Sequence, residues 1–129
     1  MQKDALEKYI FETYGIEADH PFEKYPSVAV FRHQNNKKWF AALMTVEKSK
    51  FQIPESGVTD IVNLKCDPLL SGSLILEEGI YEAYHMNKNH WISFLLEKGD
   101  DEKLKWLLDL SYTLTKKNVK AKNTIITDG

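Results

Sequence analysis

Polar recognition groups are concentrated in one stretch of the chain, Tyr84-His85-Met86-Asn87-Lys88-Asn89-His90-Trp91. The stretch brings two imidazoles, one ammonium group, two amides and two aromatic rings into eight consecutive residues. The segments on both sides of it are mostly apolar, which indicates one strand over residues 80–85 and another over residues 90–97. A connection this short favours an antiparallel pair of neighbouring strands.

One interpretation of the stretch is structural and needs no ligand. Met86 to Asn89 would form a four-residue hairpin loop, and His85 and His90 would face each other across the strand pair. Trp91 would fill the core, while the asparagines would satisfy backbone groups in the turn.

The other interpretation is a binding site for a small anion or a nucleotide. Lys65 and Lys88 would supply positive charge, the histidines would supply donors that respond to pH, and Tyr84 would offer a stacking surface. The candidate binding residues are Lys65, Tyr84, His85, Asn87, Lys88 and His90. Lys88 is the strongest candidate, because a lysine inside this cluster is not expected to be needed for folding. In the structural interpretation it would be a solvated loop tip.

The segment before this stretch predicts a strand followed by a helix. Residues 60–65 alternate between apolar and polar side chains, as a strand does. Asp67 is placed to cap a helix that begins at Pro68, a position where proline is favoured. The buried stripe of this helix is expected to consist of Leu69, Leu70, Leu74 and Ile75.

The remaining elements are a hairpin and two terminal helices. Strands are predicted over residues 28–31 and 39–46, and the second is so continuously apolar that it should be central. Helices are predicted over residues 3–14, with Asp4 as N-cap and Gly15 at the C-cap, and over residues 101–117. The order is helix, three strands, helix, two strands, helix. It predicts an α+β fold in which one antiparallel sheet of about five strands is covered by helices.

The composition limits the classes of function. The formal net charge is −2 and Arg32 is the only arginine, which argues against sequence-specific reading of DNA. Cys66 is the only cysteine, so no internal disulfide can form, which fits a reducing cytoplasm. No apolar run approaches the roughly 20 residues that cross a bilayer, so a cytoplasmic protein without a membrane partner is expected.

Two other kinds of site fit these residues less well. Cys66 could act as a nucleophile activated by the helix that follows it, but no oxyanion-hole signature accompanies it, so a small buried residue is expected. His85 and His90 could begin a zinc site, which needs three or four ligands. No catalytic residue, metal or cofactor is therefore predicted.

The motifs above resemble those of the MmcQ/YjbR family of small bacterial proteins. The stretch 84–91 is close to that family's His-Met-Asn-Lys-x-His-Trp signature, and Leu64-Lys65-Cys66-Asp67-Pro68 is similar to its strand-to-helix junction. Pro21-Phe22 and Ser111-Tyr112 add weaker matches. The resemblance implies a fold like those of secretion chaperones and frataxin. The length of the chain predicts a single domain, placed over residues 1–118, and residues 119–129 are predicted to form a flexible tail.

The resemblance also implies possible functions. Many members of the family are labelled DNA-binding by analogy of shape, although fold does not imply function. The first hypothesis is a non-enzymatic cytoplasmic protein that binds nucleic acid weakly and without sequence preference through Lys65, His85, Lys88 and His90. The lysines at 116, 117, 120 and 122 would assist it, unless they are simply a solvated end. The alternatives are a protein-binding adaptor or chaperone-like module, and a protein that binds a small ligand or nucleotide.

Overall fold

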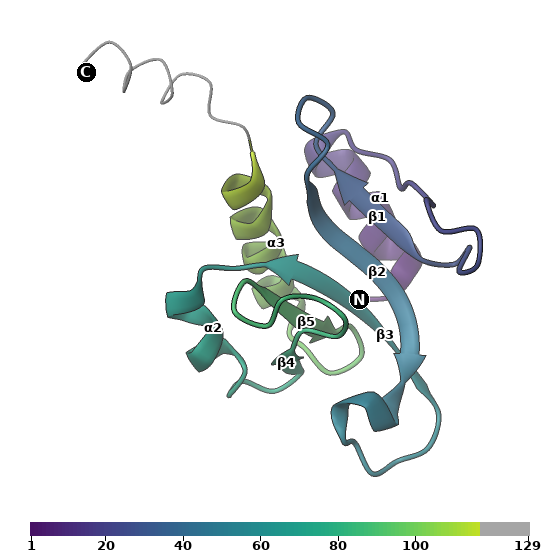
Figure 1. Cartoon of the computed structure of the whole chain (residues 1–129), viewed down its shortest axis with the longest axis vertical. Coiled ribbons are helices and arrows are strands. Elements are labelled where there is room, and N and C mark those ends of the chain that lie inside the picture. The colour runs from purple at the N-terminus through teal and green to yellow at the C-terminus, as the bar shows by residue number, and fades with distance from the viewer. Residues whose placement is uncertain (117–129) are drawn as a thin grey trace.

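The computed structural model describes residues 1–116 and contains one open sheet of five antiparallel strands, in the order β1-β2-β3-β5-β4 (Figure 1). The strands are β1 (Ala29–Arg32), β2 (Trp39–Glu47), β3 (Val58–Lys65), β4 (Ile80–Glu82) and β5 (Trp91–Leu95). The helices are α1 (Lys3–Tyr14), α2 (Pro68–Leu74), α3 (Asp101–Thr115) and the short 3-10 helix η1 (Lys48–Phe51). The α+β class and the order of the elements are confirmed. The predicted tail over 119–129 lies outside the described residues.

One face of the sheet carries the main core, which is covered by α1 and α3 (Figure 1). Each helix presents an apolar stripe at helical spacing, and the inward-facing residues of the strands meet it. The buried helical residues are Leu6 and Ile10 in α1, and Leu104, Leu107 and Leu108 in α3. Within residues 1–116, no helix is long and apolar enough to cross a bilayer.

The opposite face carries a smaller apolar cluster of Val46, Ile53, Ile61 and Leu95. Residues 48–57 cover part of it, and Phe51 and Ile53 of this connection pack against the cluster. Within residues 1–116, no other helix covers the rest of this face. β2 lies inside the sheet, between β1 and β3, and has buried residues on both faces, which explains why its sequence is almost continuously apolar.

Hydrogen bonds tie α3 to the sheet. The buried hydroxyl of Ser111 donates to the carbonyl of Phe40 and accepts the N–H of Lys65 at 2.9 Å. The ring of Tyr112 stacks on that of Tyr14 at 4.3 Å between centroids, which joins α3 to α1. Ser111 and Tyr112, a pair that gave one of the weaker matches to the family, therefore have structural roles.

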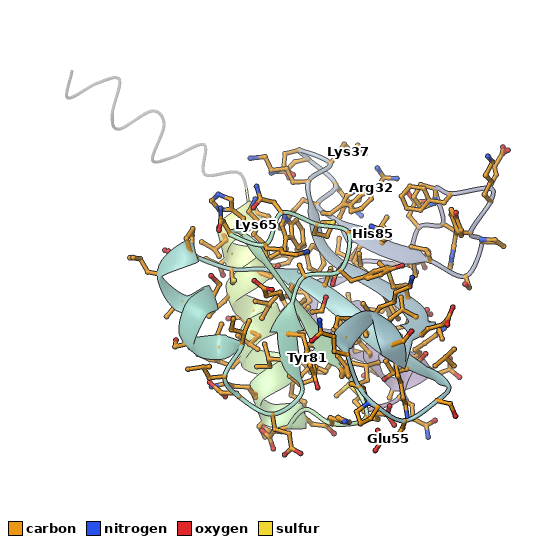
Figure 2. The ribbon with its side chains drawn as sticks, turned by 60° about the horizontal axis from the view of Figure 1, so that its bottom comes forward. Arg32, Lys37, Glu55, Lys65, Tyr81 and His85 are labelled. Carbon is orange, nitrogen blue, oxygen red and sulfur yellow. The ribbon has the colours of Figure 1, made fainter. Side chains whose placement is uncertain are left out.

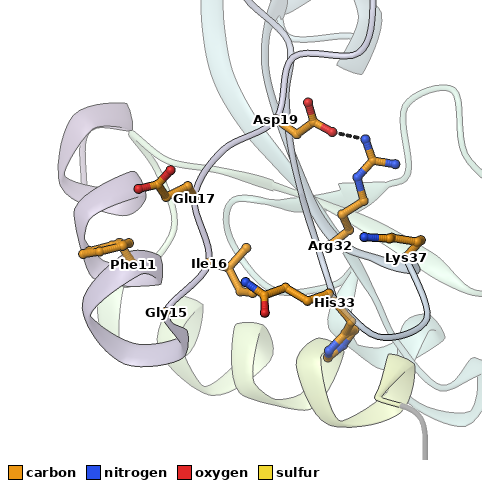
Figure 3. Close-up of a pocket in the computed structure, with 9 residues that line it drawn as sticks. Phe11, Gly15, Ile16, Glu17, Asp19, Arg32, His33 and Lys37 are labelled. Atoms are coloured by element: carbon orange, nitrogen blue, oxygen red, sulfur yellow. Dashed lines mark hydrogen bonds and ion pairs between the residues drawn. The ribbon is translucent and has the colours of Figure 1, made fainter.

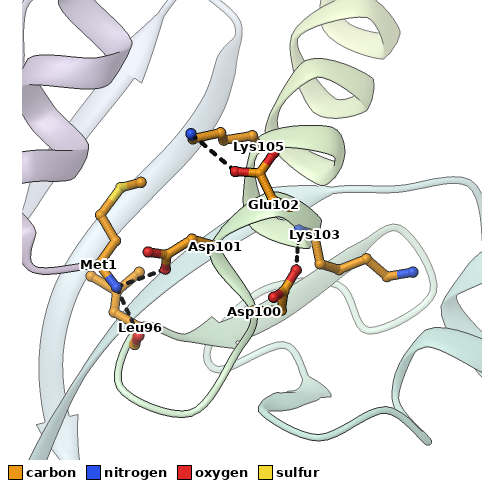
Figure 4. A network of polar contacts seen from close by, with 7 residues as sticks. All are labelled: Met1, Leu96, Asp100, Asp101, Glu102, Lys103 and Lys105. Atoms are coloured by element: carbon orange, nitrogen blue, oxygen red, sulfur yellow. Dashed lines mark hydrogen bonds and ion pairs between the residues drawn. The ribbon is translucent and has the colours of Figure 1, made fainter.

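Polar contacts also fix the start of α3 (Figure 4). The side chain of Asp100 accepts the N–H of Lys103 at 2.9 Å and so caps the helix. The terminal ammonium of Met1 donates to Asp101 at 2.8 Å and to the carbonyl of Leu96 at 3.4 Å. The segment before α1 is therefore attached to the beginning of α3.

Three local predictions were wrong. α1 begins at Lys3 after Gln2, so Asp4 lies in its first turn and is not the N-cap. Leu69 is 90% exposed and Leu70 is also exposed, because they lie in the first turn of a seven-residue helix and only its last turn meets the core. β4 ends at Glu82, so residues 83–90 form a longer irregular connection in place of a four-residue hairpin loop.

A buried polar pair holds the start of that connection. Asn63 of β3 and Ser93 of β5 are directly opposed and fully buried, and the hydroxyl of Ser93 donates to Asn63 Oδ1. Asn63 Nδ2 donates to the carbonyl of Tyr84 at 3.0 Å, and the N–H of Tyr84 donates to Ser93 at 2.9 Å. Both backbone groups of Tyr84 are thus bound by side chains of the sheet.

His33, at the end of β1, is a second buried polar residue. Its Nε2 lies 2.8 Å from Thr115 Oγ1 and 3.1 Å from the carbonyl of Tyr112. Because a carbonyl can only accept, Nε2 carries the proton. Burial lowers the pKa of His33 below its ordinary value.

We predict that Asn63→Leu lowers the free energy of unfolding by about 1–3 kcal/mol, because the carbonyl of Tyr84 and the hydroxyl of Ser93 lose their buried partner. Urea unfolding measures the change. Asn35→Leu, at an exposed turn position, is the control and should change stability by less than about 0.5 kcal/mol. Equal small changes in both variants would contradict the structural role of Asn63.

We also predict that the stability contributed by neutral His33 is lost on acidification. The native pKa lies below the unfolded one, so the unfolded state binds the extra proton first, and stability falls as pH drops below about 6.5. Urea unfolding between about pH 7.5 and about pH 5 should show a larger loss in the wild type than in His33→Gln. His90→Gln, at an exposed site, should behave like the wild type. Identical pH profiles for the wild type and His33→Gln would refute the prediction.

Candidate functional site

A groove of about 670 Å³ lies on the sheet face opposite α1 and α3. Its floor is β2, and it touches residues at both ends of this strand, from Trp39 to Glu47. One wall is the segment before β1, through Phe22, Tyr25 and Val28. The other wall is the connection 83–90, through Tyr84, His85 and Met86.

The lining of the groove is mostly apolar and aromatic. The ring of Phe22 meets that of Trp39 edge to face at 5.9 Å, which closes one end. Tyr25 is 65% exposed at the rim, and Met44 lies half-buried in the floor. Glu47 and Lys50 are the lining residues with full charges, so the groove carries little net charge.

Two of the six predicted binding residues, Tyr84 and His85, line the groove. Figure 2 labels His85 in the connection between β4 and β5. Their rings meet edge to face at 4.1 Å between centroids. His85 has a φ of 55°, in the left-handed region that residues other than glycine rarely adopt. The backbone of Tyr84 is fixed by Asn63 and Ser93, so this strained turn follows directly after an anchored residue.

Asn87 and Lys88 make contacts inside the connection itself. Asn87 Oδ1 accepts the N–H of Asn89 at 2.9 Å, and its carbonyl accepts the N–H groups of His90 and Trp91. The ammonium of Lys88 donates to the carbonyl of Ala83 at 2.9 Å. Lys88 therefore braces the connection, although it was expected to be unnecessary for folding.

Lys65 and His90 lie outside the groove lining. The ammonium of Lys65 is 5.5 Å from the centre of the Trp91 ring, its partner across β3 and β5. Trp91 is half-buried beneath it and does not fill the core as expected. The side chain of His90 is exposed, and its carbonyl accepts the N–H of Cys66 at 2.8 Å. The six predicted residues therefore do not share one cavity.

The sequence did not reveal Phe22, Tyr25, Trp39 or Met44 as site residues. Trp39 and Met44 lie in a continuously apolar strand, where periodicity cannot separate an open groove from a closed core. Phe22 was noted only through the family resemblance. The signal that was present is the clustering of aromatic residues on both sides of the first hairpin strand.

Cys66 is buried, as the sequence predicted. Burial, and then the neighbouring charge of Asp67, raises the pKa of its thiol above the ordinary value. A thiol with a raised pKa is a poor nucleophile. The residue is therefore a packing element at the end of β3.

A second cavity of about 400 Å³ lies between the end of α1 and the β1–β2 hairpin (Figure 3). Arg32, Lys37, Glu17 and Asp19 contribute charges of both signs to it. The guanidinium of Arg32 is already paired with Asp19. Two of the four charged groups that line this cavity are therefore already paired with each other and are less available to a ligand.

Comparison with known proteins places this chain among relatives of the same architecture. The model of the YjbR family matches residues 11–114. The uncharacterised protein YyaQ of Bacillus subtilis is 42% identical over 117 residues, covering 90% of this chain and 99% of YyaQ. The crystal structure of a Pseudomonas syringae protein, 41% identical, has a TM-score of 0.88 and covers 90% of this chain and 100% of its own.

A more distant solved structure gives the same fold. The Deinococcus radiodurans protein is 26% identical, with a TM-score of 0.66 over 96% of this chain and 86% of its own. The family match spans both walls and the floor of the groove. The chain belongs to the YjbR family.

Proposed function

We propose that this protein is a non-enzymatic binding protein whose groove holds an extended apolar segment of another protein. The observation that carries the proposal is the shape of the groove, which touches both ends of a nine-residue strand. At about 3.4 Å per residue, β2 is about 30 Å long. A compact small molecule would occupy only part of that length, whereas an extended peptide would follow all of it.

The chemistry of the lining supports the same ligand. Aromatic residues and methionine dominate the most buried parts of protein interfaces, and methionine adapts to partners of different shape. Met44 in the floor and Met86 in the wall provide this adaptability, and Trp39 provides a rigid anchor. The low net charge of the groove fits a ligand whose contacting surface is apolar.

Nucleic-acid binding, the first hypothesis from the sequence, stays a prediction. A nucleic acid requires cationic groups along its phosphate backbone. In the groove Lys50 is the lining lysine, while Lys88 and Lys65 lie outside the lining and already contact Ala83 and Trp91. These observations favour a polypeptide ligand over a nucleic acid.

We predict that a phage library of random dodecapeptides, panned on the wild-type protein, enriches peptides with apolar side chains. The best enriched peptide, labelled with fluorescein, should bind at least about tenfold more weakly to Met44→Glu, because the variant buries a charge in the groove floor. Fluorescence anisotropy measures both affinities. The matched control is Leu114→Glu, an exposed apolar position on α3, which should bind like the wild type.

Two outcomes would overturn this function. One is the absence of any peptide enrichment over the starting library, or equal binding to the Met44→Glu variant. The other is tighter binding of labelled single- or double-stranded DNA at low salt than of the peptide, lost in Lys65→Ala or Lys88→Ala and kept in Met44→Glu. The second outcome would establish the nucleic-acid hypothesis in its place.

A further inference from the structure

β1 pairs with only part of β2. The register places Ala29 opposite Leu43, but β2 continues to Glu47, where β3 still accompanies it through Val58. Before Ala29 the chain leaves the sheet in two turns, closed by the N–H of Val28 on Tyr25 and by the N–H of Tyr25 on Phe22. No strand of the described chain therefore lies beside the last part of β2 on the β1 side.

The directions of the backbone groups follow from neighbouring hydrogen bonds. The N–H of Lys48 donates to the carbonyl of Gly57, on the β3 side. Because successive residues of a strand direct their backbone groups to opposite sides, Val46 also bonds to β3, while Thr45 and Glu47 point the other way.

The first hairpin strand agrees with this alternation. Val30 exchanges two hydrogen bonds with Asp19, of 2.9 and 2.8 Å, so its backbone faces away from β2. Ala29 then faces β2, and its partner Leu43 faces β1. Thr45 and Glu47 follow Leu43 by two and four residues, so they point to the same side, beyond the end of β1.

These two backbone positions are open. The register places Thr45 and Glu47 in non-hydrogen-bonded pairs with Asp60 and Val58 of β3, and within residues 1–116 no backbone hydrogen bond joins either residue to a segment outside the strands. The groove touches residues 44–47 consecutively, although their side chains alternate between the two faces of the sheet. The groove therefore runs along the free edge of β2, and Val28 lines its opposite side.

We propose that a segment of a partner protein adds to the sheet as an extra strand beside residues 45–47 of β2, in line with β1. This inference rests on the proposed function and specifies how the groove holds its ligand. Alternating donors and acceptors at strand spacing are matched by an extended polypeptide backbone and by no other common ligand. Alternate side chains of that strand enter the apolar groove.

Charge specifies the partner further. The carboxylate of Glu47 has no ion pair or hydrogen bond recorded within the described part of the chain. Side chains directly opposite in paired strands interact, and like charges there are destabilising. The partner segment therefore carries a lysine or arginine opposite Glu47, and its apolar side chains face Val46 and Met44 at the positions one and three residues further along the strand.

The test uses the peptide enriched in the phage selection and two substitutions at one position. Glu47→Pro removes the free N–H at a strand edge, where proline is tolerated, and should weaken peptide binding about five- to tenfold. Glu47→Gln keeps the N–H and removes only the charge, so it should weaken binding about two- to threefold and reduce the preference for a basic residue. Thermal unfolding of both variants checks that the fold is retained.

Amide hydrogen exchange measured by NMR gives a second readout that does not depend on the variants. In the free wild type, the amides of Thr45 and Glu47 should exchange rapidly and those of Met44 and Val46 slowly. Saturation with the peptide should slow Thr45 and Glu47 by at least about tenfold, as paired backbone amides are protected.

Each outcome separates the two levels of the proposal. A peptide that binds, is sensitive to Met44→Glu and leaves exchange at Thr45 and Glu47 unchanged would overturn strand addition and leave the proposed function standing. Absence of peptide binding would remove the proposed function itself. If both amides exchange slowly in the free protein, and become slower still as the protein concentration rises, a second copy of the chain occupies the edge. That result would overturn the proposal that another protein supplies the strand.

Discussion

The buried pair of Asn63 and Ser93 holds the start of the connection that forms one wall of the groove on the second face of the sheet. Two polar side chains inside an apolar layer must be hydrogen-bonded, and here the backbone of Tyr84 is their partner. The regular pairing of β4 and β5 ends at Glu82, just before this anchored residue, and residues 83–90 form an irregular connection. The connection then becomes a wall of the groove, and His85 is placed on it by a left-handed turn.

The two faces of the sheet differ in how completely other elements cover them. On the first, α1 and α3 complete a closed core, with Ser111 bonded to two strands and aromatic rings joining the helices. On the second, short connections cover only the cluster around Ile61. The uncovered part of this face combines apolar side chains with the end of β2, which extends beyond the part of the strand that pairs with β1. A surface of that kind offers both the area and the backbone groups that a bound strand requires.

The candidate site was only partly predictable. The stretch 84–91 was correctly identified as unusual, and Tyr84 and His85 do line the groove. Lys88 and Asn87 are used within the connection, because a non-regular backbone needs partners for its own polar groups. Trp39 and Met44 were hidden, since a strand pattern shows that a residue is apolar and does not show whether something covers it.

The sequence by itself determined the α+β class, the order of the elements, the Asp67 cap of α2 and the glycine end of α1, because these depend on periodicity and on local backbone preferences. Only the tertiary structure decided where β1 stops relative to β2, which face α1 and α3 leave uncovered, and which groups form hydrogen bonds with the side chain of Asn63. Those features arise from contacts between residues far apart in the chain, and local patterns carry no information about such partners.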